Sequence, residues 1–293
     1  MNLLIIPRAK LPAAAWDAFV GAHRSGWFWH TARWLDYGLS LGGDRADLSF
    51  AVVNSASQLV GLCPLIREGA RGTFEGAPGA WPLLTPASRS HGVFVEIERH
   101  GLDVRFRSCP VASPPPHCDE LAIGWSSRVL DLAPAPAVLH ASLRKSYKAL
   151  INAVPPHQIH VDDRGELMSA YQAVHRAAGG TRPDETYQHQ ARWIDAGQAF
   201  LVGAKDAGQW AAFAYVFFYK QAAYYGSGPS LAPNLQHAIV WRAILEAKAR
   251  GARVFELGWQ GHGTDKERRI AHFKAGFGGE DRPIWVMALR GTL

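Results

Sequence analysis

The chain has 293 residues, of which 48% are hydrophobic and 19% are charged, a balance typical of a globular protein with one large or two medium domains. Its formal net charge of +6 permits an anionic partner such as tRNA, a nucleotide-sugar or a membrane surface, and it fits a generally basic surface equally well. The three cysteines, Cys63, Cys109 and Cys118, are odd in number and lack metal-ligand spacing, which argues against a disulfide framework and a zinc site.

The amino-terminal residues 1–6 are apolar, but this run is shorter than the hydrophobic part of a signal peptide, and Arg8 and Lys10 follow it closely. No stretch of the sequence approaches the roughly 18 apolar residues that a membrane-spanning helix needs. The sequence therefore predicts a cytoplasmic protein that has no integral membrane contact.

The first half of the chain alternates short apolar runs with turn-forming residues. Thr31 is placed to cap a helix, and the polar segment 54–57 joins two strands as a hairpin. Residues 73–86 are rich in Gly and Pro, which indicates a loop or a broken strand. The expected elements are strands at 1–6, 48–53, 58–67 and 128–132, helices at 13–23 and 32–41, elements of uncertain type at 93–100 and 104–109, and a stiff segment at 113–117.

Pro134 and Pro136 mark an expected domain boundary, because the order of helices, hairpin and mixed elements restarts after them. We therefore expect one domain at residues 1–135 and a second at residues 136–293. The elements expected in the second half before residue 222 are helices at 138–154, 166–178 and 183–196, a strand at 159–161, and a hairpin of strands at 199–205 and 211–219.

The last part of the chain predicts the order strand, helix, strand, helix and strand. A strand at 222–226 runs into a Gly-Ser-Gly-Pro break, and a helix capped by Asn234 and ended by Gly251 follows. A strand at 253–258, a basic helix at 266–275 and a final strand at 283–289 complete the pattern. This order implies parallel neighbouring strands with a right-handed crossover. The exposed N–H groups at the start of the first helix then suit an anionic group.

Several motifs of the second half resemble the Fem family of peptidyl and aminoacyl transferases. The resemblance covers roughly residues 140–283 and is weaker in the first half, near Trp34 and the segment Val60-Gly-Leu-Cys-Pro-Leu. The matching motifs are Leu143-Arg-Lys-Ser-Tyr-Lys, Thr181-Arg-Pro, Ala223-Tyr-Tyr-Gly-Ser, His237-Ala-Ile-Val-Trp, Phe255-Glu-Leu-Gly and Ile270-Ala-His-Phe-Lys-Ala-Gly-Phe-Gly-Gly. The resemblance implies an α/β fold of two tandem Gcn5-related N-acetyltransferase (GNAT) domains, each with a mixed, twisted sheet flanked by helices.

The resemblance further implies the transfer of an activated acyl group to an amine. In Fem enzymes the donor is aminoacyl-tRNA, whereas ordinary GNAT enzymes use acetyl-CoA and hold its pyrophosphate on a glycine-rich loop at a helix N-terminus. This chain has Ser230-Leu-Ala-Pro-Asn at that place, without those glycines and with Pro233, which has no N–H to offer. The sequence therefore favours aminoacyl-tRNA as donor, with a cell-envelope or secondary-metabolite precursor as the amine acceptor.

Two alternatives stay open at this stage. The first is an acyl-CoA-dependent N-acetyltransferase that acts on an amino sugar or another amine. The second is a binding module for nucleotide-sugars or RNA that catalyses no reaction. No tightly bound cofactor and no metal are expected, because the histidines lack metal-ligand spacing and neither a phosphate-binding loop nor a dinucleotide fingerprint occurs.

Lys274 is the predicted catalytic residue, since the resemblance aligns it with the lysine that such transferases place beside the reacting ester. An amine that attacks an ester forms a tetrahedral oxyanion, which a fixed ammonium group stabilises. Phe273, directly before it, is predicted to line the same site. The alternative for Lys274 is an ordinary solvated lysine on a basic helix face.

Cationic residues elsewhere in the second half are predicted to bind the substrate. Arg144 and Lys145, together with Tyr147, form a candidate clamp for the phosphates of tRNA or of a nucleotide-linked acceptor. The alternative for this group is an ordinary amphipathic helix with Tyr147 turned inward. Arg182 lies in a Gly-rich turn between two helices, where an arginine is well placed to reach a ligand.

The remaining predicted binding residues lie at the ends of the two parallel strands. The resemblance implies that Tyr225, Gly226 and Ser227 line the gap where those strands separate. Glu256 is a carboxylate within an apolar strand, which requires a partner, so it is predicted to act as a base or to orient Lys274 or an arginine, with a structural ion pair as the alternative. Trp259 is expected in a flexible loop, where it would cover the site and stack on a ring of the substrate.

Overall fold

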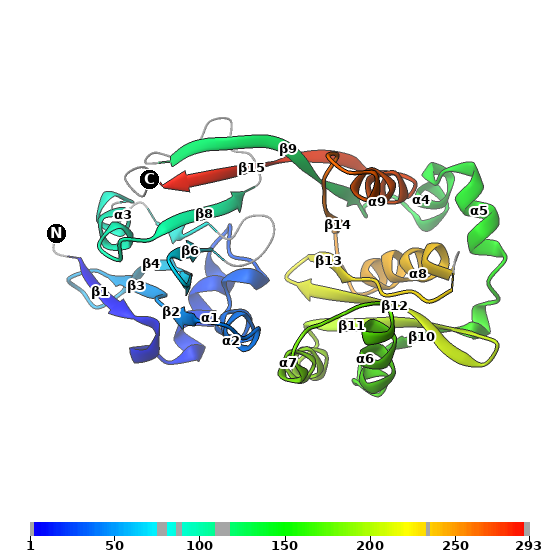
Figure 1. Ribbon diagram of the computed structural model, residues 1–293, viewed down its shortest axis with the longest axis horizontal. Coiled ribbons are helices and arrows are strands. Elements are labelled where there is room, and N and C mark those ends of the chain that lie inside the picture. The colour runs from blue at the N-terminus through cyan, green and yellow to red at the C-terminus, as the bar shows by residue number, and fades with distance from the viewer. Residues whose placement is uncertain (1–2, 75–80, 86–89, 109–117, 233–234, 290–293) are drawn as a thin grey trace. The chain divides into compact units, whose positions relative to one another are not determined.

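The computed structural model describes residues 3–74, 81–85, 90–108, 118–232 and 235–289 (Figure 1). The chain divides into two compact units. Unit 1 comprises Met1–Trp125 and Pro283–Leu293, and unit 2 comprises Ser126–Arg282. The long strands β9 (Cys118–Asp131) and β15 (Glu280–Leu289) each contribute residues to both units.

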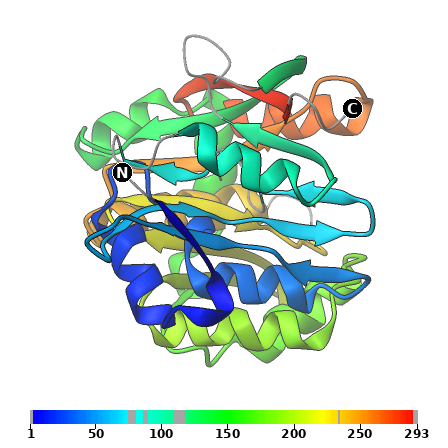
Figure 2. The ribbon, with the colours of Figure 1, turned by 90° about the vertical axis from the view of Figure 1, so that its left-hand side faces the viewer.

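Unit 1 contains an antiparallel sheet in the order β1-β3-β4-β7 and a second group of strands in the order β15-β8-β6-β5-β2. Figure 2 shows α1 and α2 over one face of the first sheet and α3 over the other. The elements are β1 (Leu4–Pro7), α1 (Ala13–Ala22), α2 (Ala32–Ser40), β2 (Arg45–Asp47), β3 (Phe50–Val53), β4 (Leu59–Cys63), β5 (Ile66–Glu68), β6 (Arg71–Thr73), β7 (Leu83–Leu84), α3 (Ser90–Glu98) and β8 (Asp103–Ser108).

Aromatic side chains form a cluster in the core of unit 1 near α1 and α2. Trp16 and Phe28 are fully buried there, and the Trp16 indole N–H donates to the His30 carbonyl at 2.6 Å, which satisfies the one polar atom of that ring. The Thr31 hydroxyl accepts from the Trp34 N–H at 3.3 Å, so the predicted helix cap is confirmed. Cys63 is buried, and burial raises the pKa of its thiol.

Unit 2 has one mixed sheet in the order β10-β11-β12-β13-β14-β9. Every neighbouring pair in it is antiparallel except β13 and β14, which run parallel. The elements are α4 (Pro136–Ser142), α5 (Lys145–Asn152), β10 (Ile159–Asp162), α6 (Met168–Ala177), α7 (Asp184–Asp195), β11 (Ala199–Asp206), β12 (Gln209–Tyr219), β13 (Ala222–Ser227), α8 (Leu235–Ala249), β14 (Val254–Gln260) and α9 (Asp265–Ala275).

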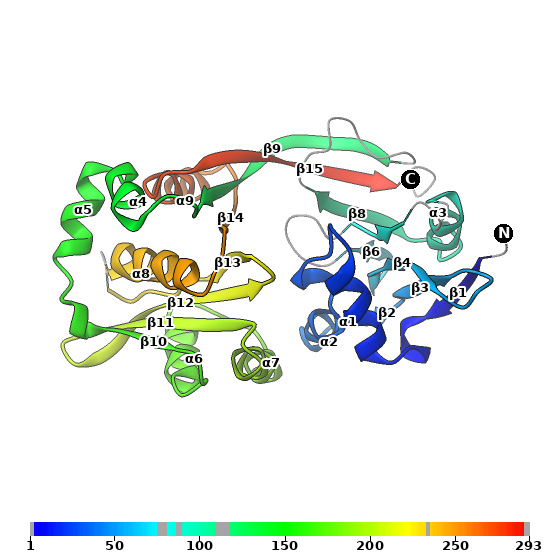
Figure 3. The ribbon, with the colours of Figure 1, turned by 180° about the vertical axis from the view of Figure 1, so that it is seen from behind.

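The alternation of side chains along β12 separates the two faces of this sheet. Phe213 and Tyr215 pack against Tyr171 of α6. The residues that alternate with them, Ala212, Ala214 and Val216, belong to the core under α8. Figures 1 and 3 show α6 and α7 on one side of the sheet and α8 on the other, with α5 and α9 on the α8 side. This layered arrangement confirms the expected α/β fold class.

The single helix expected at 138–154 is wrong, because the chain breaks into α4 and α5. Leu143 and Arg144 have extended backbone, with ψ of 144° and 138°. The Arg144 N–H donates to the Gly276 carbonyl at 2.9 Å, so a bond to a distant segment replaces the helical one. The uncertain segment 93–100 lies largely in α3, and the proposed cap Asn234 and the segment 113–117 lie outside the described residues. No described helix has the length and apolar character needed to cross a bilayer.

A candidate active site between two diverging strands

The central feature of unit 2 is the point at which the parallel strands β13 and β14 separate. Their pairing covers only three residues of each strand, Ala222–Tyr224 against Val254–Glu256. β13 continues to Ser227 and β14 to Gln260, so both strands extend past the last paired residues. Their unpaired ends leave backbone groups that face a gap rather than a neighbouring strand.

Two β-bulges explain why the strands separate here. In β13, Gly226 is the extra residue opposite the step from Tyr215 to Val216 of β12. In β14, Leu257 is the extra residue before Gly258, opposite the step from Val129 to Arg128 of β9. A bulge bends its strand and increases its local twist. Because each bulge lies on the outer side of its strand just beyond the last pair, the two strands turn away from each other.

Glycines are required at both bulges. A Cβ on Gly226 would lie 2.3 Å from the Phe217 ring. Gly258 has φ of +77°, and a Cβ there would lie 2.7 Å from the Tyr224 hydroxyl. A side chain at either position would force the strands out of this geometry.

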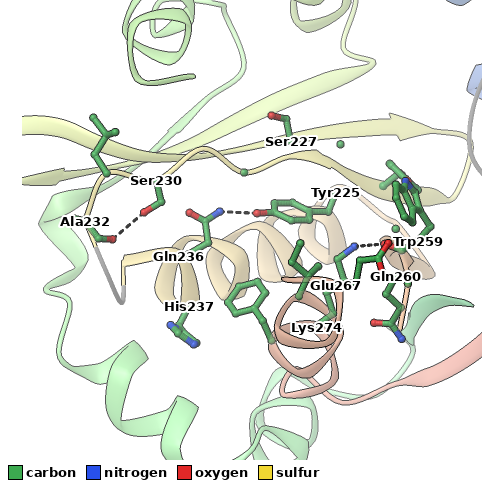
Figure 4. A pocket seen from close by; sticks show the side chains of 18 residues that line it. Tyr225, Ser227, Ser230, Ala232, Gln236, His237, Trp259, Gln260, Glu267 and Lys274 are labelled. Atoms are coloured by element: carbon green, nitrogen blue, oxygen red, sulfur yellow. Dashed lines mark hydrogen bonds between the residues drawn. The ribbon is translucent and has the colours of Figure 1, made fainter. Parts of the chain in front are cut away.

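The gap opens into a cavity of about 690 Å³, a size typical of small-molecule sites. Its walls come from the end of β13, the segment before α8, the first turn of α8, the end of β14 and one face of α9 (Figure 4). The lining residues are Tyr224, Tyr225, Gly226, Ser227, Gly228, Ser230, Leu231, Ala232, Gln236, His237, Gly258, Trp259, Gln260, Gly261, Glu267, Ile270, Phe273 and Lys274.

Lys274 projects from α9 into this cavity and is only 8% exposed. Its Nζ donates to the Trp259 carbonyl at 2.7 Å (Figure 4), and the bulge at Leu257 and Gly258 directly precedes that carbonyl. Burial lowers the pKa of Lys274 to about 8, and the nearby Glu256 carboxylate acts in the opposite direction. The side chain is therefore still mostly an ammonium group at neutral pH. The alternative of a solvated lysine on an exposed face does not fit this burial.

Glu256 lies on β14 next to the cavity but does not line it. Its carboxylate accepts a short hydrogen bond from the Ser127 hydroxyl of β9. Burial raises the pKa of Glu256 to about 7, against the effects of the Ser127 hydrogen bond and of the positive charges on Arg282 and Lys274. Glu256 and Lys274 form no direct ion pair within 4.0 Å. The carboxylate therefore acts on the ammonium through space and helps to keep it protonated.

Tyr225 crosses the cavity from β13 toward α8. Its hydroxyl accepts a hydrogen bond from the Gln236 side-chain N–H at 2.6 Å (Figure 4), and burial raises the pKa of this phenol. Gly228 leaves the space that the hydroxyl occupies, because a Cβ there would lie 1.6 Å from it. The contact therefore bridges the end of β13 and the first turn of α8.

Arg182 and Ser227 both lie next to Tyr171. The Arg182 guanidinium donates to the Tyr171 hydroxyl at 2.8 Å and lies 4.9 Å above the Tyr187 ring. Burial raises the pKa of the Tyr171 phenol, and the neighbouring Ser227, which lines the cavity, opposes that shift. Arg182 is not among the lining residues, so its connection to the cavity runs through Tyr171. Its proposed contact with a substrate remains a prediction.

Arg144, Lys145 and Tyr147 do not line the cavity. Tyr147 is 5% exposed and donates its hydroxyl to the Phe273 carbonyl at 3.0 Å, so it supports the cavity wall from behind. Arg144 is partly buried and meets His272 of α9 at 2.6 Å between Nη1 and Nε2. Lys145 is exposed at the start of α5. For Tyr147 this orientation agrees with the alternative of an amphipathic helix whose tyrosine is turned inward.

The expectation that Trp259 lies in a flexible loop is wrong. Trp259 belongs to β14 and pairs with Ser127 of β9. Trp259 lines the cavity, which agrees with the predicted contact to the substrate. Its backbone is part of the sheet and does not form a mobile cover over the site. The sequence pattern placed the end of this strand too early, because the glycine at the bulge, Gly258, is typical of a loop.

Sequence reasoning missed several lining residues. One of them is His237, which packs edge-to-face against the predicted residue Phe273 with ring centres 5.1 Å apart. Leu231 and Ile270 are 50% and 40% exposed, and both line the cavity, so its walls include exposed apolar surface. Gln236 could have been found from its position in the first turn of the helix after β13. Nothing in the sequence indicated that Leu231 and Ile270 belong to one site.

Known structures share this architecture. The crystal structure of FemX matches 98% of this chain and 97% of its own, with a TM-score of 0.70 and 12% sequence identity. A tandem GNAT protein from the clavulanic acid biosynthesis pathway matches 98% of both chains, with a TM-score of 0.54 and 17% identity. The C-terminal domain of a putative lysylphosphatidylglycerol synthetase from Agrobacterium fabrum matches 85% of both, with a TM-score of 0.57 and 14% identity.

The chain has the Fem-like, tandem GNAT fold. This confirms the architecture that the resemblance to the Fem family implied. No protein-family model and no curated protein matches the sequence. At these identities the similarity establishes the fold alone.

The cavity combines three features that suit acyl transfer. It holds one buried ammonium group, it presents unpaired strand backbone, and its other walls combine apolar and aromatic side chains with polar ones, among them Glu267. An ammonium group in such a poorly solvated place interacts strongly with negative charge that forms next to it. Among the described residues, no group of three or more His, Cys, Asp or Glu side chains is arranged to hold a metal ion.

Proposed function

We propose that this protein is a Fem-like N-acyltransferase whose reaction takes place in the gap between β13 and β14. The observation that carries the proposal is the buried Lys274 ammonium, which reaches the point where the two strands separate. An activated carbonyl placed in that gap lies next to both the Lys274 Nζ and the free strand backbone.

The reaction forms one bond and breaks another. The neutral amine of the acceptor attacks the carbonyl carbon of the donor, which gives a tetrahedral intermediate with a negatively charged oxygen. Lys274 stabilises that oxygen, an effect worth about 3 kcal/mol in a preorganised site. The C–O bond of the donor ester then breaks, and the amine proton passes to the departing oxygen. In its ionised form Glu256 raises the pKa of Lys274 against the effect of burial and so favours the charged form of the lysine.

Aminoacyl-tRNA is the donor that we favour. The segment before α8 carries Leu231 and Ala232 at the cavity wall, where a pyrophosphate-binding loop would need closely spaced glycines. The contact between the Tyr225 hydroxyl and Gln236 bridges the space between β13 and α8, which narrows the path that a long pantetheine arm would follow. The terminal ester of a tRNA needs to insert only a short group into the same gap.

An acyl-CoA donor is the second candidate, because the same cavity extends from the strand gap to the first turn of α8. A helix N-terminus beyond a β-strand is the usual place for a phosphate group. In this case Tyr225 would have to move away from Gln236 when the donor binds.

A donor comparison tests the proposal. The purified protein is incubated with a pool of radiolabelled aminoacyl-tRNA, or with labelled acetyl-CoA, and with the low-molecular-mass fraction of the producing cells as a source of acceptor. We expect label to move from tRNA to a small amine, and we expect ribonuclease to abolish the transfer. Transfer from acetyl-CoA that resists ribonuclease would replace the favoured donor, and transfer from neither donor would contradict the assignment as an acyltransferase.

A further inference from the structure

A basic surface lies on the outer side of α9 and at the start of α5. It carries six formal cations against one carboxylate, Asp265, because Glu267 of the same helix lines the cavity, and the segment from residue 132 to residue 161 contains no acidic residue. We call it the α5–α9 basic face. Its members are Arg144, Lys145, Lys148, Lys266, Arg268, Arg269 and His272.

The two helices adjoin each other, so these residues form one surface. The Arg144 N–H donates to the Gly276 carbonyl just after α9, and the Arg144 guanidinium contacts the His272 ring at 2.6 Å. Figures 1 and 3 show α5 and α9 on the same side of α8. The face therefore continues from the side chains of α9 to the exposed Lys145.

This surface is separate from the cavity, although one helix serves both. Ile270 and Lys274 of α9 line the cavity, whereas Arg268, Arg269 and His272 are exposed around a shallow depression on another side of the helix. Helical spacing explains this division, because residues three or four apart share a side. α9 therefore carries the reactive lysine on one side and cations on another.

Few of these charges are neutralised within the protein. Arg268 pairs with the Asp265 carboxylate. Within the described ranges, no carboxylate lies within ion-pair distance of Lys145, Lys266 or Arg269. The start of α5 adds to the positive potential, because its first turn contains no acidic residue and no side chain caps it. Such clustering costs electrostatic energy that a bound polyanion would relieve.

We infer that the α5–α9 basic face binds the phosphate backbone of the tRNA whose aminoacyl end enters the cavity. This inference rests on the proposed function and adds the location of the nucleic acid to it. From Asp265 to His272, α9 rises about 10 Å, and Arg144 and Lys145 extend the surface further. That length suits two or three successive phosphates, each bound by a cationic side chain.

RNA suits this face better than an anionic membrane does. A helix that lies on a membrane exposes large apolar side chains beside its cations. Ile270, the exposed aliphatic residue of α9, lines the cavity instead of joining the cations. The four residues that line the depression on the other side, Asp265, Arg268, Arg269 and His272, are all polar or charged.

Binding of fluorescently labelled, deacylated bulk tRNA tests the inference. The double variant Lys266→Glu/Arg269→Glu is compared with the wild type and with a double control, Arg192→Glu/Lys205→Glu. The control residues lie on α7 and β11, away from the face. Each lost phosphate contact should lower the slope of log affinity against log salt by about 1. We therefore expect the face variant to lose about 2 from that slope and at least tenfold in affinity at low salt, with the control near wild type.

Two measurements separate failure of the inference from failure of the proposed function. Transfer from full aminoacyl-tRNA should show at least a tenfold higher KM in the face variant, whereas transfer from an aminoacylated CCA trinucleotide should be unchanged. Equal KM and equal salt slopes in variant and wild type would overturn the inference while leaving the transferase assignment intact. Transfer from acetyl-CoA alone, with no tRNA affinity, would overturn both.

A vesicle experiment tests the membrane alternative. Vesicles of equal parts phosphatidylglycerol and phosphatidylcholine are sedimented with the wild type and with the face variant. Equal sedimentation of the two proteins is expected. Loss of vesicle binding in the variant, with unchanged affinity for tRNA, would assign the face to an anionic lipid surface and contradict the inference.

Discussion

Replacement of Lys274 by methionine should make the protein more stable near neutral pH while it removes the reactive group. Burial lowers the pKa of Lys274 from 10.5 to about 8, and the side chain is only 8% exposed. A shift of that size costs the folded state about 3 kcal/mol near pH 7. Methionine has a similar length and no charge, so Lys274→Met removes this cost. The lost hydrogen bond to the Trp259 carbonyl offsets part of the gain, by about 1 kcal/mol.

The dependence on pH isolates the charge from the hydrogen bond. Because the folded-state pKa lies below the unfolded value, the unfolded chain binds more protons between about pH 8 and about pH 10.5, and the contribution of Lys274 to stability rises with pH across that range. Between about pH 7 and about pH 9.5 its cost falls from about 3 to about 1.4 kcal/mol. The advantage of Lys274→Met should therefore shrink by about 2 kcal/mol over this interval.

Urea unfolding of both proteins at several pH values provides the assay, with the free energy of unfolding taken from the midpoint and slope. Lys205→Met is the control for the loss of a lysine side chain, because that lysine lies on β11, outside the cavity. Parallel pH profiles for Lys274→Met and wild type would mean that Lys274 titrates as a solvated lysine. That result would refute the reasoning that the gap is a poorly solvated site.

Two further predictions concern the residues that shape the site. Gly258→Ala should lower stability by about 1–3 kcal/mol and reduce transfer, because a Cβ at φ of +77° would lie 2.7 Å from the Tyr224 hydroxyl. The control is Gly251→Ala, where φ is +90° and the space around the residue is open; it should lower the melting temperature without affecting transfer. Equal activity of the two variants would contradict this prediction. Ser127→Ala should raise the pKa of Glu256 above about 7, because the Ser127 hydrogen bond lowers it; carbon-13 NMR of the labelled carboxyl group measures that pKa, and an unchanged value would remove Ser127 from the site.

The sequence predicted the order of elements in unit 2 well, because each signal there is local. The apolar spacing of α8, the turn between β11 and β12, and the basic pattern of α9 all lie within short windows. The parallel pairing of β13 with β14 followed from the intervening helix. The division of the chain at residue 135 stays a prediction, and the contribution of residues 283–293 to unit 1 depends on contacts that no local pattern records.

Other features could not be read from the sequence because distant residues determine them. The break between α4 and α5 depends on the bond from Arg144 to Gly276, and Trp259 is held in β14 by its pairing with β9. The sequence of this basic helix does not distinguish Lys274 from the other cations. The structure shows that Lys274 is buried whereas Arg268 and Arg269 are exposed. The role of Ser127 required knowledge of which strand lies next to Glu256.

The most direct test of the central claim is the single-turnover rate of acyl transfer by Lys274→Ala at saturating donor. The claim is that the buried ammonium stabilises the oxyanion that forms between β13 and β14. Loss of such a donor typically lowers the rate by about 10²–10³-fold, and we expect that loss with little change in donor affinity. A folded Lys274→Ala protein that transfers the acyl group at the wild-type rate would contradict the claim.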